Sequence, residues 1–133
     1  MNRKDLGQIY YINREIEDIK ERLAELQSDY LRATKLSQDV VQTSGTSDRV
    51  GNLACAMADL QTLYSIKLQE LYLKKSQVER FISGIDDAEV RLIFRLRHIN
   101  CLEWSEIAAE INYSERHARR KYSIQLNMSD NVR

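Results

Sequence analysis

Apolar residues recur three and four positions apart early in the chain, and this spacing is the strongest constraint on its fold. The pattern runs through Ile9, Ile12, Ile16, Ile19, Leu23, Leu26 and Tyr30. Such heptad spacing is typical of helices that pack through a narrow apolar seam. The flanking positions are polar, so the seam suits one partner helix better than a broad core. We predict a helix from Asp5 to Leu36.

A second seam follows after a polar interruption. Its apolar positions are Val50, Leu53, Met57, Leu60, Tyr64, Leu68, Leu71, Val78 and Ile82. Asp48 suits the N-cap of this helix, and Ser83 with Gly84 suits its end. Strict continuation beyond Tyr64 would place Lys67 and Lys74 in the seam, so we expect the register to slip near Leu68.

The interruption between the seams covers Ser37 to Asp48 and is rich in serine and threonine. These residues bond the local backbone, and Gly45 permits positive φ, so we predict a loop where the chain reverses. Two helices of about 30 residues would each span roughly 45 Å. The partner of each seam stays open between an intramolecular hairpin and a dimer or four-helix bundle, because heptads do not identify the partner helix.

The composition agrees with an all-α fold. The 133 residues include no proline and only four glycines, with 43% apolar and 30% charged residues. We predict a long antiparallel, coiled-coil-like hairpin over residues 1–84, which is also the oligomerisation region. A small helix-turn-helix module should follow over residues 85–133. The sequence shows no membrane-spanning run and no secretion signal, so we expect a cytoplasmic protein.

The segment after Gly84 has the pattern of a helix-turn-helix. Asp86 is predicted to cap a helix and to form a capping box with Glu89, and this helix breaks near Asn100. Its polar face carries arginines, of which Arg91 and Arg95 are candidate phosphate contacts. In the next helix Ile107 and Ile111 lie four positions apart, and Ala108 permits a close helix crossing. The turn then has Asn112 in the left-handed region, Tyr113 packed inward and Ser114 as the cap of the last helix.

The last helix has the composition of a DNA-recognition helix. We expect Ala118 and Tyr122 to face inward, while the outward residues, with the capping Ser114, form the predicted DNA-binding site: Ser114, Glu115, Arg116, His117, Arg119 and Arg120. A solvated charged face on a protein-binding three-helix unit would give the same composition. The whole chain balances 20 basic against 20 acidic residues, so DNA contact must come from a local patch.

Several motifs together resemble the phage-encoded ArpU and RinA type regulators of Gram-positive hosts. They are Tyr30-Leu31-Arg32-Ala33-Thr34, Ser47-Asp48-Arg49-Val50-Gly51, Trp104-Ser105-Glu106-Ile107-Ala108 and Tyr113-Ser114-Glu115-Arg116. The resemblance covers most of the chain and implies a module similar to the fourth region of bacterial sigma factors. It also implies control of phage late or packaging genes in the bacterial cytoplasm, with double-stranded DNA as partner and host RNA polymerase as a further contact.

The chain departs from that family pattern at a few positions. Glu103 stands where serine or threonine usually caps, and Asn112 stands where glycine is usual. Ala118 and Lys121 replace larger apolar residues, which predicts a loosely anchored last helix.

Other functional classes are less well supported by the residues. An enzyme would depend on His98 or His117, neither of which has a ligand or base partner at the right spacing, so we expect no catalytic, metal or cofactor site. Cys55 and Cys101 are expected to be reduced, partly buried and unreactive thiols, with a disulfide as the alternative. A protein-interaction adaptor of a phage assembly or replication complex remains the main alternative function.

Overall fold

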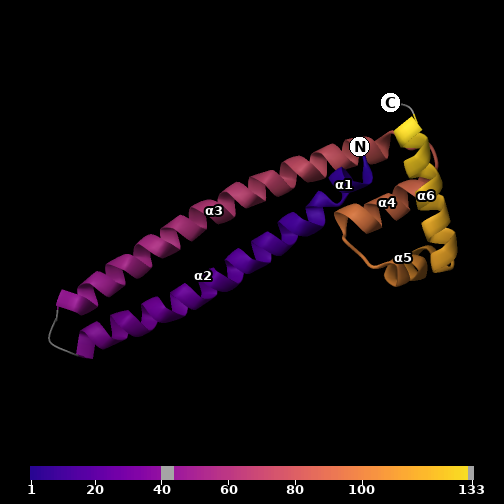
Figure 1. Cartoon of the computed structure of the whole chain (residues 1–133). Coiled ribbons are helices and arrows are strands. Elements are labelled where there is room, and N and C mark those ends of the chain that lie inside the picture. The colour runs from indigo at the N-terminus through magenta and orange to yellow at the C-terminus, as the bar shows by residue number, and fades with distance from the viewer. Residues whose placement is uncertain (40–43, 132–133) are drawn as a thin grey trace. The chain divides into compact units, whose positions relative to one another are not determined.

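The computed structural model describes residues 1–39 and 44–131, which form helices with no strand among them. The elements are α1 Arg3–Leu6, α2 Gln8–Asp39, α3 Ser44–Ser83, α4 Ala88–Phe94, the π-helical η1 Arg95–Ile99, α5 Trp104–Ile111 and α6 Glu115–Asn131 (Figure 1). The prediction of an all-α fold is confirmed. None of the described helices is long and apolar enough to cross a membrane.

The chain contains two compact units. The hairpin unit is Arg14–Gln69, and the terminal unit combines Met1–Asn13 with Glu70–Arg133. This division differs from the predicted boundary after residue 84. The difference arises because the first residues of the chain and the end of α3 belong to the same compact unit as the C-terminal helices.

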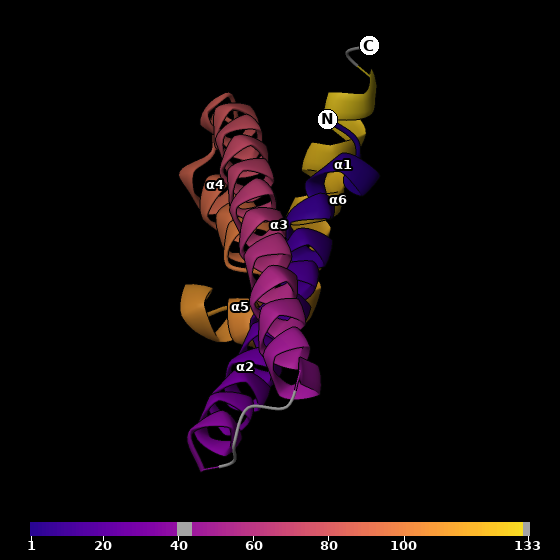
Figure 2. The same cartoon turned by 90° about the vertical axis from the view of Figure 1, so that its left-hand side faces the viewer.

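In the hairpin unit, α2 and α3 lie side by side and run in opposite directions (Figures 1 and 2). The predicted seam lines their interface: Ile16 and Ile19 are each 4% exposed, and Leu23, Leu26 and Tyr30 are half-buried. Across from them the seam residues of α3 are also half-buried. Lys67, which the heptad register would place in the seam, extends its amine to within 2.5 Å of Glu15 Oε2 on α2. The charge of Lys67 beside the seam is therefore paired.

The turn of the hairpin is shorter than predicted. Helix α2 continues to Asp39 and α3 begins at Ser44, so Asp48 lies inside α3 and does not cap it. Residues 40–43 of the predicted loop lie outside the described residues. Serine and threonine cost a helix only up to about 0.7 kcal/mol each relative to alanine, which is too little to end it.

The helical structure begins before the predicted start at Asp5, because α1 starts at Arg3. Asn2 caps α1, because its side chain accepts a hydrogen bond from the Asp5 backbone N–H at 2.9 Å. In turn, the Asp5 carboxylate accepts a hydrogen bond from the Asn2 backbone N–H at 3.4 Å. Gly7 separates α1 from α2 with near-helical angles. This reciprocal capping box fixes the start of the helical chain.

The core of the terminal unit draws on segments that are distant in sequence. Leu6 and Ile9 from the N-terminus are fully buried, as are residues of α3, α4 and α5, namely Val78, Ile82, Ile93, Phe94 and Ile107. The Phe94 ring lies 4.7 Å from the Tyr122 ring, centroid to centroid, and 5.9 Å from that of Phe81. This shared core holds the C-terminal helices on the ends of the two long ones.

Helix α4 begins one residue later than predicted. Asp87, not Asp86, is its N-cap, and its carboxylate accepts hydrogen bonds from the N–H groups of Glu89 at 2.8 Å and Val90 at 3.4 Å. These bonds, chiefly that from Glu89, hold the pKa of Asp87 below its usual value. The predicted helix end near Asn100 is confirmed, because Asn100 terminates η1 with a hydrogen bond from its N–H to the Arg95 carbonyl.

Candidate nucleic-acid interface

A three-residue turn joins α5 to α6, as the sequence predicted. Asn112 ends α5 in the left-handed region at φ 59° and ψ 35°, a conformation that asparagine tolerates better than most residues. The Tyr113 N–H then bonds the Ala108 carbonyl at 3.2 Å. Ser114 caps α6, because its hydroxyl accepts a hydrogen bond from the His117 backbone N–H at 3.2 Å. The turn chemistry thus fixes the angle at which α6 leaves α5.

The inward faces of both helices are largely as predicted. Ile107 and Ala108 of α5 are buried, as are Ala118 and Tyr122 of α6. Glu103, where a serine or threonine cap was expected, starts α5 through a hydrogen bond from its N–H to the Glu106 carboxylate at 2.9 Å.

The prediction that Tyr113 packs inward is wrong. Its side chain is 54% exposed, and its ring stacks on the His117 imidazole with centroids 4.1 Å apart. The left-handed residue Asn112 turns the chain outward just before Tyr113, which explains the exposure. An aromatic surface therefore lies at the start of α6.

Arg116 and Arg120 form an exposed basic surface on α6. They lie four residues apart, hence on the same face, and both are exposed. Together with Ser114 and His117 they line a shallow recess of about 370 Å³ beside the first turn of α6. This face is the part of the predicted DNA-binding site that the structure leaves open to a partner.

Arg119 and Glu115 are also exposed, but they interact within the chain. The Arg119 guanidinium lies 3.9 Å from the Glu115 carboxylate, and it sits 5.5 Å from the Trp104 ring centre. Arg97 lies over the same ring at 5.0 Å. Arg119 is therefore partly engaged within the terminal unit.

The sequence predicted that His117 faces outward, but its side chain contacts α4. Its Nε2 lies 2.7 Å from the Glu89 carboxylate on α4, and the side chain is half-buried. Lys121 adds longer contacts to Asp87 at 3.6 Å and Glu89 at 3.9 Å. These polar contacts supply the anchoring of α6 that larger apolar residues would otherwise provide.

Arg91 and Arg95, predicted as phosphate contacts, are used inside the terminal unit. Arg91 donates to the carbonyls of Ile85 at 2.6 Å and Asp86 at 2.9 Å. Arg95 makes a bidentate pair with the Glu79 carboxylate, with both bonds at 3.0 Å. The Arg95 hydrogen bond lowers the pKa of Glu79. Both arginines therefore have a structural role that differs from that of the exposed α6 arginines. Their N–H groups bind α3 and the segment that connects it to α4.

The charge near α6 is mixed. The exposed residues of α5 include Glu106 and Glu110, and its N-cap Glu103 is also exposed. The basic surface is therefore confined to the first turns of α6. A partner that carries negative charge would be attracted to this patch and repelled from α5.

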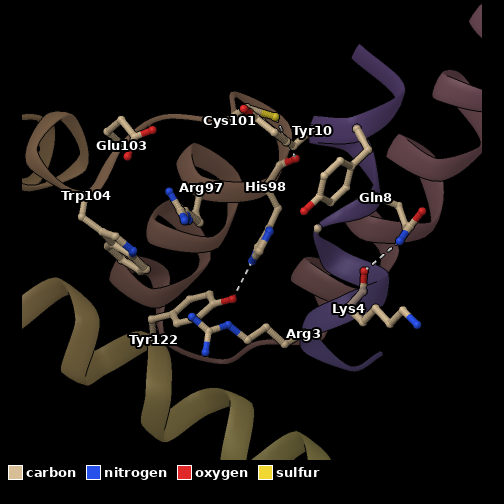
Figure 3. Close-up of a pocket in the computed structure, with 12 residues that line it drawn as sticks. Arg3, Lys4, Gln8, Tyr10, Arg97, His98, Cys101, Glu103, Trp104 and Tyr122 are labelled. Atoms are coloured by element: carbon tan, nitrogen blue, oxygen red, sulfur yellow. Dashed lines mark hydrogen bonds between the residues drawn. The ribbon is translucent and has the colours of Figure 1, made fainter. Parts of the chain in front are cut away.

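His98 is a buried polar residue of the terminal unit. The ring is 7% exposed, and its Nε2 lies 2.9 Å from the Tyr122 hydroxyl (Figure 3). Burial lowers the pKa of His98 to about 4, and the charges of Arg97 and Arg3 act in the same direction against a hydrogen bond with the Leu6 backbone. The ring is therefore neutral near pH 7 and acts as part of the core.

The two cysteines differ in their surroundings, and both are free. Cys55 is exposed, so the expectation of partial burial is wrong for it. Cys101 is half-buried at a positive φ of 55°, and burial raises the pKa of its thiol. A thiol with a raised pKa forms less of the reactive thiolate.

Sequence reasoning missed a second recess of the terminal unit, of about 630 Å³ (Figure 3). Residues of α1 and the start of α2 line one side, including Arg3 and Tyr10, while Arg97, Trp104 and Tyr122 contribute from η1, α5 and α6. The adjacent pairs Arg3-Lys4 and Tyr10-Tyr11 were the available signal. Nothing local indicated that they meet residues some ninety positions later.

The described residues thus form an all-helical protein in which a capped turn presents a basic α6 surface. They contain no group of three or more His, Cys, Asp and Glu side chains that could hold a metal ion. The chain matches no family model, no curated protein and no solved structure.

Proposed function

We propose that this protein is a sequence-specific regulator of transcription that binds double-stranded DNA through α6. One observation carries the proposal: the Asn112–Ser114 turn presents Arg116 and Arg120 together on the exposed face of the first turns of α6. In helix-turn-helix proteins these turns of the second helix enter the major groove.

The chemistry of the two arginines fits this role. A guanidinium can bond the O6 and N7 atoms of guanine in bidentate fashion, and it can equally pair with a phosphate. The recess beside Ser114 gives a phosphate oxygen room next to the N–H groups at the start of α6. Glu115, His117 and Arg119 flank this surface, where they would adjust base preference despite their contacts within the chain.

The family resemblance of the turn motifs extends the proposal to biology. It supports control of phage late or packaging genes in the host bacterial cytoplasm, with host RNA polymerase as a further contact, and a role without catalysis or cofactor. The long hairpin supports self-association, because two copies joined through it would carry two α6 surfaces to neighbouring half-sites.

Selection of binding sites from a random duplex pool tests the proposal directly. We expect a preferred sequence whose affinity falls steeply with salt. The double variant Arg116→Ala/Arg120→Ala should bind the selected site at least about tenfold more weakly, whereas Arg80→Ala, an exposed arginine of α3, should bind normally. No enrichment of any sequence, or an unaffected double variant with an intact helical spectrum, would overturn the proposal.

A protein-interaction adaptor is the second candidate, and the acidic exposed side of α5 favours it. Glu103, Glu106 and Glu110 would face the DNA backbone unfavourably if α5 crossed it closely. Binding to DNA that is weak, independent of sequence and unaffected by the double variant would favour the adaptor.

A further inference from the structure

We propose that the 630 Å³ recess of the terminal unit is a binding site for a mononucleotide, meaning an aromatic base that carries a phosphate group. Its volume lies within the range of about 300 to 1,000 Å³ that is common for small-molecule sites. The inference does not rest on DNA binding, because none of its lining residues belongs to the exposed basic face of α6.

The charge of the lining residues selects an anion. Arg3, Lys4 and Arg97 contribute three cationic groups, and Glu103 is the only acidic residue among those that line the recess. Arg3 and Lys4 are exposed, and Arg97 uses one N–H on the Leu102 carbonyl at 3.0 Å. Its other guanidinium donors have no hydrogen bond in the described part of the chain that competes with a ligand. A cationic ligand would be repelled, and a purely apolar one would leave these groups without partners.

The aromatic content of the recess selects a planar ring. Tyr10 and Tyr11 are 51% and 62% exposed, and they meet edge to face with centroids 5.4 Å apart. Figure 3 shows Tyr10 on the side of the recess opposite Trp104. Aromatic faces beside arginines are the combination that proteins use to stack nucleic-acid bases. A bound base would cover tyrosine surface that is otherwise left to water.

The inner wall of the recess offers no competing anion site. The polar atoms of His98 and Tyr122 bond each other at 2.9 Å, so they are occupied before any ligand enters. The phosphate must therefore lie at the rim, where Arg3, Lys4 and Arg97 can reach it, while the base lies against the aromatic rings. Neither an aromatic ring alone nor a phosphate alone would contact both the cationic rim and the aromatic rings of the recess.

Titration of the full chain with AMP, GMP, CMP and UMP tests the site. Trp104 is the only tryptophan and lines the recess, so its fluorescence should change saturably, and calorimetry should give the same affinity. Adenosine and inorganic phosphate should each bind at least about tenfold more weakly than AMP, because each lacks one half of the recognition. Equal binding of either one, or no saturable response to any nucleotide, would overturn the inference.

Variants locate the binding on the molecule. Arg3→Ala and Tyr10→Leu change exposed side chains and should each weaken AMP by about five- to tenfold, while Arg80→Ala should bind like the parent. The Arg116→Ala/Arg120→Ala variant must also retain AMP binding. Loss of AMP binding in that variant, or unchanged AMP binding in Arg3→Ala and Tyr10→Leu, would place the nucleotide elsewhere. A short oligodeoxyadenylate that bound tenfold tighter than AMP would overturn the assignment to a free mononucleotide. Each outcome is independent of whether duplex DNA binds.

Discussion

The imidazole of His98 and the hydroxyl of Tyr122 form a buried hydrogen bond of 2.9 Å that joins η1 to α6. Both side chains are less than a tenth exposed, at 7% and 4%. A buried polar group that loses its partner costs about 1 to 3 kcal/mol. This bond therefore helps to hold α6 against η1.

Stability should fall on mild acidification because of His98. In the unfolded chain the histidine has its ordinary pKa of 6.5, whereas burial lowers the folded pKa to about 4. Below pH 6.5 the unfolded state binds a proton that the folded state does not, so stability present at higher pH is lost as the pH falls toward 4. The linkage relation gives a loss of about 2 kcal/mol between pH 7 and pH 5. Urea unfolding at several pH values measures it.

Two variants separate His98 from the other titrating groups. His98→Gln is less stable at pH 7 but should lose most of the dependence between pH 7 and 5, because glutamine does not titrate. His117→Gln keeps His98 and should retain the dependence. An unchanged slope in His98→Gln would contradict the assignment.

The left-handed residue of the turn gives a second prediction. Asn112→Val should destabilise the protein by about 1 to 2 kcal/mol, because a β-branched side chain is strained at φ 59°. Asn112→Gly should be as stable as the parent or more stable, since glycine adopts this conformation freely. Thermal unfolding measures both. Asn127→Val, at an exposed helical position of α6, is the matched control and should change little.

The seam of the hairpin unit gives a third prediction. Ile16→Asp combined with Leu23→Asp should destabilise the hairpin by at least about 3 kcal/mol, because it places two unpaired charges in the apolar seam. Circular dichroism during urea unfolding measures the loss. Ala24→Asp with Gln27→Asp adds the same charge at exposed positions of α2 and should be tolerated. Retained stability in the seam variant would contradict its role.

Self-association through this hairpin is a separate expectation. The exposed Leu31 and Leu36 of α2 and Leu63 and Ile66 of α3 leave apolar surface on the hairpin unit. Sedimentation equilibrium should therefore give a mass above that of one chain at tens of micromolar. A strictly monomeric mass would remove the oligomer from the proposal.

Much of the fold could be predicted because the decisive signals are local. Heptad spacing reports burial directly, so Ile16, Ile19 and their partners were found without a structure. The left-handed Asn112 and the capping Ser114 were found for the same reason. The N-cap of α4 was misplaced by one residue, because Asp86 and Asp87 are adjacent and chemically identical.

The site was harder to predict because it depends on tertiary partners. An arginine on a polar helix face looks the same in sequence whether it meets a phosphate or, as Arg95 does, the Glu79 carboxylate sixteen residues earlier. His117 is likewise engaged by Glu89, twenty-eight residues away. The recess with Arg3 and Trp104 arises only when the chain termini share one core. Periodicity carries no information on such distant contacts.

Arg95 gives a fourth prediction that separates structural from DNA-binding arginines. Arg95→Gln should destabilise the protein by no more than about 1 kcal/mol, because the Arg95–Glu79 pair is 41% exposed on both sides. Affinity for the selected DNA site should stay within about twofold of the parent, a difference of about 0.4 kcal/mol. Fluorescence anisotropy measures the affinity. A uniform loss for all sequences with a flatter salt dependence would restore Arg95 as a phosphate contact.

Replacing Arg116 and replacing Arg120 should weaken DNA binding in different ways if α6 enters the major groove. Arg116 is the second residue of α6 and lies where side chains reach base edges, so Arg116→Ala should weaken the selected site by about 1 to 3 kcal/mol and random duplex much less. Arg120 lies one turn later, within reach of the backbone. Arg120→Ala should therefore weaken both duplexes alike and reduce the salt slope by about one. Anisotropy titrations of both duplexes at three or more salt concentrations resolve the two patterns. Arg49→Ala, an exposed arginine of α3 in the hairpin unit, controls for loss of net positive charge and should leave affinity and slope nearly unchanged. Equal losses from all three variants would mean that general charge, and not the geometry of α6, determines binding.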